Sequence, residues 1–132
     1  MGPQAYRLAF QSAVMYVKAP SLSEESITYA LGKGRSFMAF EFLGPADSFT
    51  FTAEGDGRPF EMGDEFSAEK AVFHVHAPKK ALLRLICNGQ IIAERKGREL
   101  VYLADTPSVC RAEAYKGKKV WILSNPIYWK ER

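Results

Sequence analysis

The sequence contains no apolar run that approaches the ~20 residues of a membrane-spanning helix. It also opens without the basic, apolar and small-residue regions of a secretory signal. Cysteine is scarce, with two residues among 132, which excludes a disulfide-rich scaffold. These absences lead us to expect a cytoplasmic protein without a membrane partner.

The two cysteines, Cys87 and Cys110, both fall in apolar segments with strand-like patterns. A free thiol in such a segment behaves as a small hydrophobic group, and neither cysteine has a C-x-x-C neighbour for a metal. The two could touch if their strands are neighbours. Because the cytosol disfavours disulfides, we expect two reduced, buried thiols.

The chain also has little excess of charge of one sign. Its 18 Lys and Arg residues and 15 Asp and Glu residues leave a net charge of +3. The basic residues collect in three short segments, at 79–80, 95–98 and 116–119, where turns favour polar side chains. Nucleic-acid binders instead show a clustered basic stripe beside exposed aromatic rings. We therefore expect no nucleic-acid partner.

One short helix is predicted near the N-terminus, from Ser23 onward. Ser23 can cap the first turn, and the acidic pair at 24–25 suits the positive end of the helix dipole. Ile27 and Ala30 then share a face, and Gly32 supplies a residue that ends helices. A helix of about three turns needs a partner surface to be stable.

Alternation of apolar residues with period two follows this helix and predicts strands, as does the apolar stretch from Tyr6 to Lys18. Asn88 and Gly89 predict a two-residue hairpin turn. Within residues 35–42, Met38, Phe40 and Phe42 share a face. Alternation leads us to expect five phenylalanines in the core, namely Phe37, Phe40, Phe42, Phe49 and Phe51. The other predicted strands cover residues 49–53, 71–77, 82–87, 90–95, 99–104, 109–115, 120–124 and 127–129.

The pattern indicates a mainly β fold, an Ig-like antiparallel β-sandwich of about seven to nine strands with one short N-terminal helix. A chain of 132 residues with 47% hydrophobic content suits one compact domain. We assign the N-terminal strand and helix to residues 1–33 and the β-sandwich domain to residues 34–132.

Few side chains are candidates for chemistry. His74 and His76 are the only histidines and project from one face of a predicted strand, so they are weak candidates for metal ligands. A third ligand could come from Asp64, Glu65 or Glu69, although we favour a polar strand face near solvent. No catalytic nucleophile, acid–base pair or cofactor-binding motif is present, so the residues argue against an enzyme.

Aromatic residues near the C-terminus allow two interpretations. Trp121, Tyr128 and Trp129 form a possible interaction surface, on which a carbohydrate or a peptide could bind. The alternative is that the same rings pack in the core or in an interface. Exposure of Trp121 or Trp129 would favour a binding surface.

Three segments resemble metal-dependent phosphoesterases of the polymerase-and-histidinol-phosphatase (PHP) family. The segment from Trp121 to Tyr128 is similar to the closing strand of many members, and Cys110 to Ala114 is similar to the strand before it. Residues Ala30 to Phe37 resemble the segment that follows the catalytic barrel. Residues 62–64 and the Asn88–Gly89 hairpin sit where the appended sandwich of that family has comparable turns.

The resemblance implies a noncatalytic accessory domain without its barrel. The family's His and Asp metal ligands have no counterparts here, because the chain has two histidines and no aspartate before Asp47. The implied partner is a PHP barrel in the same or another chain, or a second copy bound through the N-terminal helix and strand. Two alternatives are a self-contained carbohydrate- or peptide-binding module and a metal-dependent hydrolase that uses His74 and His76.

Overall fold

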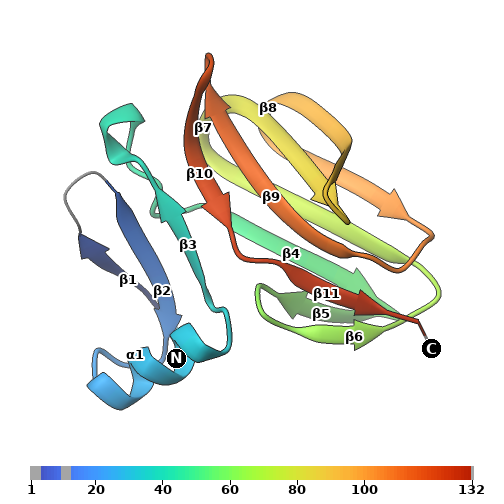
Figure 1. Cartoon of the computed structure of the whole chain (residues 1–132), viewed down its shortest axis with the longest axis horizontal. Helices are drawn as coiled ribbons and strands as arrows, with labels where there is room; N and C mark the ends of the chain where they lie inside the picture. The colour runs from blue at the N-terminus through green and yellow to red at the C-terminus, as the bar shows by residue number, and fades with distance from the viewer. Residues whose placement is uncertain (1–3, 10–12, 132) are drawn as a thin grey trace.

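The computed structural model describes residues 4–9 and 13–131, which form one α-helix, one 3₁₀ turn and eleven strands (Figure 1). The predicted mainly β fold with a single short helix is confirmed, and the strands exceed the seven to nine expected. Residues 1–3, 10–12 and 132, which belong to the predicted segments, lie outside the described residues. The elements are β1 (Gln4–Ala9), β2 (Val14–Ala19), α1 (Glu24–Gly32), β3 (Ser36–Ala39), η1 (Glu41–Leu43), β4 (Thr50–Gly55), β5 (Arg58–Glu61), β6 (Glu65–Ser67), β7 (Ala71–Cys87), β8 (Gln90–Ala104), β9 (Val109–Lys116), β10 (Lys119–Ser124) and β11 (Ile127–Lys130).

The helix begins where the sequence predicts. The Ser23 hydroxyl accepts a hydrogen bond from the Ser26 amide at 3.1 Å, which satisfies one of the free donors of the first turn. Ala30 is buried against Val17 and Ala19 of β2, with Ile27 beside them. This small cluster is separate from the main core and holds α1 against β2.

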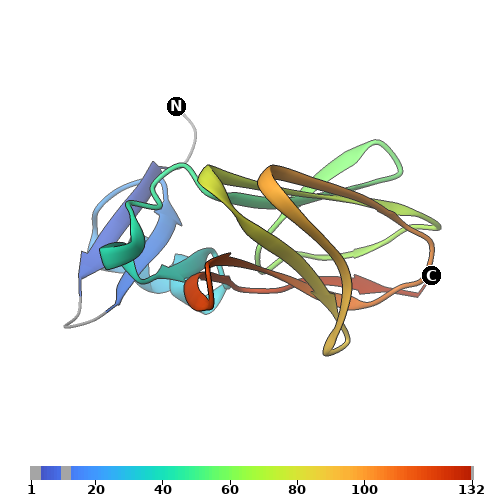
Figure 2. The same ribbon diagram turned by 90° about the horizontal axis from the view of Figure 1, so that it is seen from above.

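The strands pack in two layers, and the long hairpin of β7 and β8 extends through both of them (Figure 2). Its half at residues 71–76 pairs with β4, and its half at residues 82–87 pairs with β9. The register between β7 and β8 shifts between His76 and Ala81, which is where the ribbon bends from one layer to the other. At the other end, Asn88 and Gly89 have φ values of 51° and 79°, so the predicted turn is confirmed.

The sheet runs in the order β1-β2-β3-β10-β9-β7-β4-β5, with β8 on β7 and β11 on β9. Residues 14–17 of β2 pair with β3, so the N-terminal strands continue the sheet across the predicted boundary at residue 34. The two short strands β5 and β6 were not predicted, because each has at most four residues and both are rich in polar side chains. Strand β6 pairs with β11 in parallel.

The main core lies between the two layers and confirms most of the predicted alternation. Phe73 and Val75 are fully buried, while His74 and His76 lie on the opposite face. Of the five phenylalanines expected in the core, Phe37, Phe49 and Phe51 are buried, which confirms the prediction for them. The prediction for the other two was wrong, because Phe42 is 70% exposed and Phe40 is only partly buried. Strand β3 ends at Ala39 and the chain turns into η1, so Phe37 and Ala39 supply the buried face instead.

The expectation of two reduced thiols was also wrong. Cys87 and Cys110 form a disulfide bond, with their Cα atoms 4.1 Å apart. They are direct register partners on the neighbouring strands β7 and β9. Residues directly opposite each other in an antiparallel pair have their Cβ atoms close together. Two cysteines at such positions can therefore bond through their sulfur atoms.

Candidate functional site

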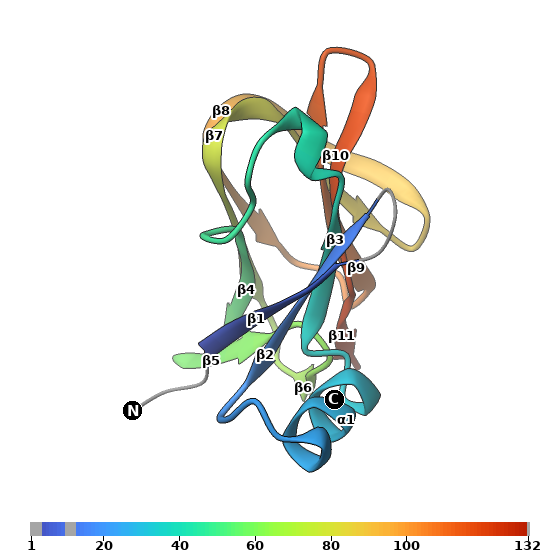
Figure 3. The ribbon, with the colours of Figure 1, turned by 90° about the vertical axis from the view of Figure 1, so that its left-hand side faces the viewer.

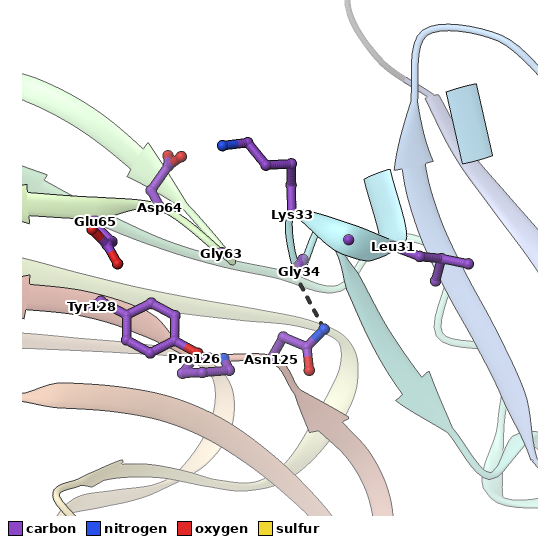
Figure 4. A pocket seen from close by; sticks show the side chains of 10 residues that line it. Leu31, Lys33, Gly34, Gly63, Asp64, Glu65, Asn125, Pro126 and Tyr128 are labelled. Carbon is purple, nitrogen blue, oxygen red and sulfur yellow. Dashed lines mark hydrogen bonds between the residues drawn. The ribbon is translucent and has the colours of Figure 1, made fainter. Parts of the chain in front are cut away.

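Three segments that lie far apart in the sequence meet at one open cleft with a volume of about 690 Å³ (Figure 4). We call it the junction cleft. It is bounded by the end of α1 with Gly34, by the turn between β5 and β6, and by the loop and first residues of β11. These three parts fall within residues 30–37, 61–65 and 124–128. The residues that line it are Leu31, Gly32, Lys33, Gly34, Gly63, Asp64, Glu65, Asn125, Pro126 and Tyr128.

Two glycines allow the backbones to meet at this cleft. Gly34 and Gly63 have φ values of +77° and +89°, which side chains rarely adopt. A Cβ on Gly34 would lie 3.1 Å from the Cα of Gly63. The Gly63 amide donates to the carbonyl of Pro126 at 2.8 Å, so the same residue touches both of the other segments.

Arg35 ties the helix end to the β5–β6 turn. Its guanidinium lies 2.7 Å from Asp64 and 3.4 Å from Glu61, and it donates to the carbonyl of Met62 at 2.7 Å. Asp64 in turn accepts a hydrogen bond from the Glu61 amide at 2.8 Å. A planar guanidinium is well matched to such a set of fixed oxygen acceptors.

Asn125 ties the third segment to the first. Its amide donates to the Ser36 hydroxyl at 2.8 Å and to the Gly34 carbonyl at 3.4 Å. The Tyr128 amide donates to the Asp64 carbonyl at 2.9 Å. Figure 4 shows Asn125 and the Tyr128 ring on one side of the two glycines, with Lys33 and Asp64 on the other, while Leu31 points away from the cleft.

The chemistry of the junction cleft is that of a structural connection. Arg35 engages Asp64, and Lys130 lies 3.0 Å from Glu65. Among the side chains that line the cleft, none is a serine, cysteine or histidine that could act as a nucleophile or a general base at neutral pH. The contact between these segments could not be predicted from the sequence, because nothing in their spacing indicates that they meet.

His74 and His76 both contact Glu99 of β8, the strand that pairs with β7, and Glu99 is the register partner of His76. His76 Nδ1 lies 2.5 Å from one carboxylate oxygen, and His74 Nε2 contacts the other. The pKa of Glu99 is lowered from its usual value, mainly by the hydrogen bond with His76. The hydrogen bond with His74 lowers it further. Asp64 and Glu65 lie instead at the junction cleft. Within residues 4–9 and 13–131, no group of three or more His, Cys, Asp or Glu side chains is arranged to hold a metal ion.

The interpretation of Trp121 and Trp129 as an interaction surface was wrong. Both side chains are almost completely buried, at 0% and 2% exposed. The Trp121 indole donates to the Gly44 carbonyl at 2.7 Å, and the Trp129 indole donates to the Ala68 carbonyl at 2.8 Å. A buried indole needs such a partner, and each finds one in a loop carbonyl. Tyr128 alone of the three is partly exposed, at the junction cleft.

A second polar cluster holds β1 and β2 to η1. Arg7 Nε lies 2.8 Å from Glu41, and the Tyr16 hydroxyl donates to the same carboxylate. Burial, followed by the hydrogen bond to Glu41, raises the pKa of Tyr16 to about 12. Burial opposes ionisation of Glu41, but the hydrogen bonds from Tyr16 and Arg7 outweigh it, so the pKa of Glu41 is lowered.

No helix among the described residues is long and apolar enough to cross a membrane. No protein-family model, curated protein or solved structure matches this chain. The structural evidence on function therefore comes from the junction cleft and from the surfaces around it.

Proposed function

We propose that this chain is a noncatalytic accessory β-sandwich domain that covers the flank of a PHP-type metal-dependent phosphoesterase barrel. The observation that supports the proposal is that three of the resembling segments meet at the junction cleft. Residues 30–37, 62–64 and 124–128 contact one another through Gly63, Arg35 and Asn125.

The helix offers the surface that such a barrel would cover. Leu22, Tyr29 and Leu31 are 69%, 68% and 39% exposed, on or just before α1. Exposed apolar side chains grouped on one element are typical of a surface that binds another protein. The junction cleft fixes the orientation of this helix relative to the sandwich, which an accessory domain would require.

Binding to a purified PHP barrel encoded in the same or the adjacent reading frame tests the proposal. The double variant Tyr29→Ser/Leu31→Ser should weaken that binding at least about tenfold, because it removes most of the exposed apolar area of α1. Phe42→Ser is the matched control, since Phe42 is equally exposed but lies on η1, away from the helix. Equal loss in both variants, or no binding by the wild-type chain, would contradict the proposal.

A noncatalytic role has its own test. The purified chain, assayed alone with Mn²⁺ and a bis(nitrophenyl) phosphate, should show no turnover above that of a buffer blank. Turnover by the chain alone that His74→Gln/His76→Gln abolishes would favour the metal-dependent hydrolase instead. The carbohydrate-binding alternative has lost its supporting observation, because the two tryptophans are buried.

A cytoplasmic location is part of the proposal and is tested by the state of the two cysteines. The Cys87–Cys110 disulfide opposes this part of the proposal, because cytosolic thiols are kept reduced and the bond would have to form only after exposure to an oxidant. Rapid alkylation in intact cells, followed by mass spectrometry, measures this state. A disulfide that is fully formed in cells would place the chain in an oxidising compartment.

A further inference from the structure

The three basic segments that the sequence keeps apart meet at one end of the structure. The bend of β7 and β8 and the turn between β9 and β10 lie at the upper end of Figure 3, together with η1, and α1 lies at the lower end. Leu82 pairs with Lys96 on one side and with Tyr115 on the other. Lys116 Nζ donates to the Lys80 carbonyl at 2.6 Å, which joins two of the segments directly.

We call this region the basic end. It carries seven of the 18 Lys and Arg residues of the chain, and all but Lys116 are exposed. Among the described residues, none of the seven forms an ion pair, whereas the neighbouring carboxylates Glu94 and Glu113 are paired with Arg84 and Arg111. The basic end therefore has an uncompensated positive charge. Its members are Lys79, Lys80, Lys96, Arg98, Lys116, Lys118 and Lys119.

A hollow of about 370 Å³ lies within the basic end. Ala81, Leu82 and Tyr115 give it apolar walls, and Lys80, Lys96 and Lys116 surround them. A second aromatic ring, Phe42, is 70% exposed nearby, and Lys119 Nζ lies 5.8 Å from its centre. Aromatic and apolar surface interleaved with lysines is suited to a ligand that combines flat rings with repeated negative charges.

We propose that the basic end binds single-stranded nucleic acid without sequence preference. The lysines would contact successive phosphates, and a base would stack on the exposed ring of Phe42 or against Tyr115, over whose ring the Arg84 guanidinium also lies at 4.5 Å. Lysine acts as a point charge, so a surface with six lysines and one arginine is suited to a phosphate backbone and does not read base identity. The sequence-based expectation of no nucleic-acid partner depended on the basic segments being far apart along the chain. In the folded structure the same segments lie side by side.

Charge and shape together favour this ligand over the other polyanions. An acidic peptide would match the lysines but would leave the apolar hollow unused. An anionic lipid surface would match the lysines and Phe42, but it would not enter a hollow walled on one side by Tyr115. The inference does not depend on the proposed accessory function, because α1 lies at the opposite end of the structure (Figure 3).

Fluorescence anisotropy with a labelled oligothymidylate of about 16 nucleotides, near the upper size of a single-domain site, tests the proposal. The triple variant Lys96→Gln/Lys118→Gln/Lys119→Gln should bind about tenfold more weakly or worse at ~0.1 M salt. The slope of log affinity against log salt should also become shallower by about 2, since each lost phosphate contact removes about 0.7. The control Lys33→Gln/Arg58→Gln/Lys70→Gln removes the same charge from other exposed sites and should leave affinity within about twofold.

Phe42→Ala separates stacking from charge. It should weaken binding several-fold and leave the salt slope unchanged, because no phosphate contact is removed. All substituted side chains are exposed, so the variants should keep the fold, which circular dichroism checks. No binding by the wild-type chain, equal loss in both triple variants, or tighter binding to duplex DNA, polyglutamate or phosphatidylserine vesicles would each overturn the proposal.

Discussion

A Cβ atom on Gly63 would lie 1.6 Å from the carbonyl oxygen of Lys33. The backbone that follows α1 therefore occupies the space in which residue 63 would carry its side chain. No change of rotamer could relieve that overlap, because both groups belong to the main chain. The position of α1 relative to the β5–β6 turn thus depends on the absence of a single methyl group.

Gly63→Ala should lower the free energy of unfolding by about 3 kcal/mol or more, since it combines a backbone overlap with a strained positive φ. Urea denaturation followed by circular dichroism measures the loss. Gly57→Ala is the matched control, because Gly57 also has a positive φ, of +74°, but has no atom within 4 Å of the added group. The control should lose about 1 kcal/mol, which is the conformational term alone. Equal losses would mean that the contact between residues 33 and 63 contributes nothing.

Removal of the disulfide should destabilise the chain by about 3 kcal/mol, because it closes a loop between residues 23 positions apart. Urea denaturation with and without dithiothreitol measures this difference. The variant Cys87→Ala/Cys110→Ala should be equally destabilised and should no longer respond to the reductant. A wild-type transition that does not move with dithiothreitol would show that the two sulfurs are not bonded in solution.

Stability at alkaline pH should depend on Tyr16. The folded pKa is raised to about 12 from the usual 10.0, so the protonated phenol is favoured by folding. The contribution is complete below pH 10 and is lost as the pH rises towards 12. The wild-type chain should lose more stability over this interval than Tyr16→Phe, and tyrosinate absorbance should show one late titration that the variant lacks.

Glu41 provides the opposite dependence at acid pH. Its folded pKa is lowered from the usual 4.5, so its stabilising effect is present above that pH and is lost as the pH falls. Glu41→Gln should flatten the stability profile below pH 4.5. A variant with the same acid dependence as the wild-type chain would contradict the role of the Arg7–Glu41–Tyr16 cluster.

The two tryptophans should fluoresce as buried indoles. Because Trp121 and Trp129 are at most 2% exposed, their emission should be shifted to the blue of free tryptophan and should resist quenching by iodide. Titration with a panel of glycans should leave the spectrum unchanged. Strong quenching by iodide in the folded chain would restore the interaction surface that the sequence suggested.

The local patterns predicted the strands well, because alternation is a property of each strand by itself. The turn at Asn88–Gly89 and the cap at Ser23 were predictable for the same reason, since their residue types satisfy the backbone at that position. Phe42 shows the limit of this reasoning. The spacing of Phe42 matches the alternation of the strand before it, but the chain leaves the sheet after Ala39. No residue type between Ala39 and Phe42 indicates that the strand ends there.

The features that depend on which strands are neighbours could not be predicted. Cys87 and Cys110 bond because β7 lies beside β9, and Gly63 meets Lys33 because β5 and β6 lie beside the end of α1. Both relationships are set by the order of strands in the sheet, which alternation does not encode. The same order brings together Lys80, Lys96 and Lys116 at the basic end.

The bend in the hairpin of β7 and β8 has a consequence for the way the molecule unfolds. Each of these strands contributes one half to either layer, so neither layer contains a full complement of strands of its own. Detaching one layer from the other would require β7 and β8 to come apart at the bend that joins their two halves. We therefore expect the two layers to unfold together in a single cooperative transition.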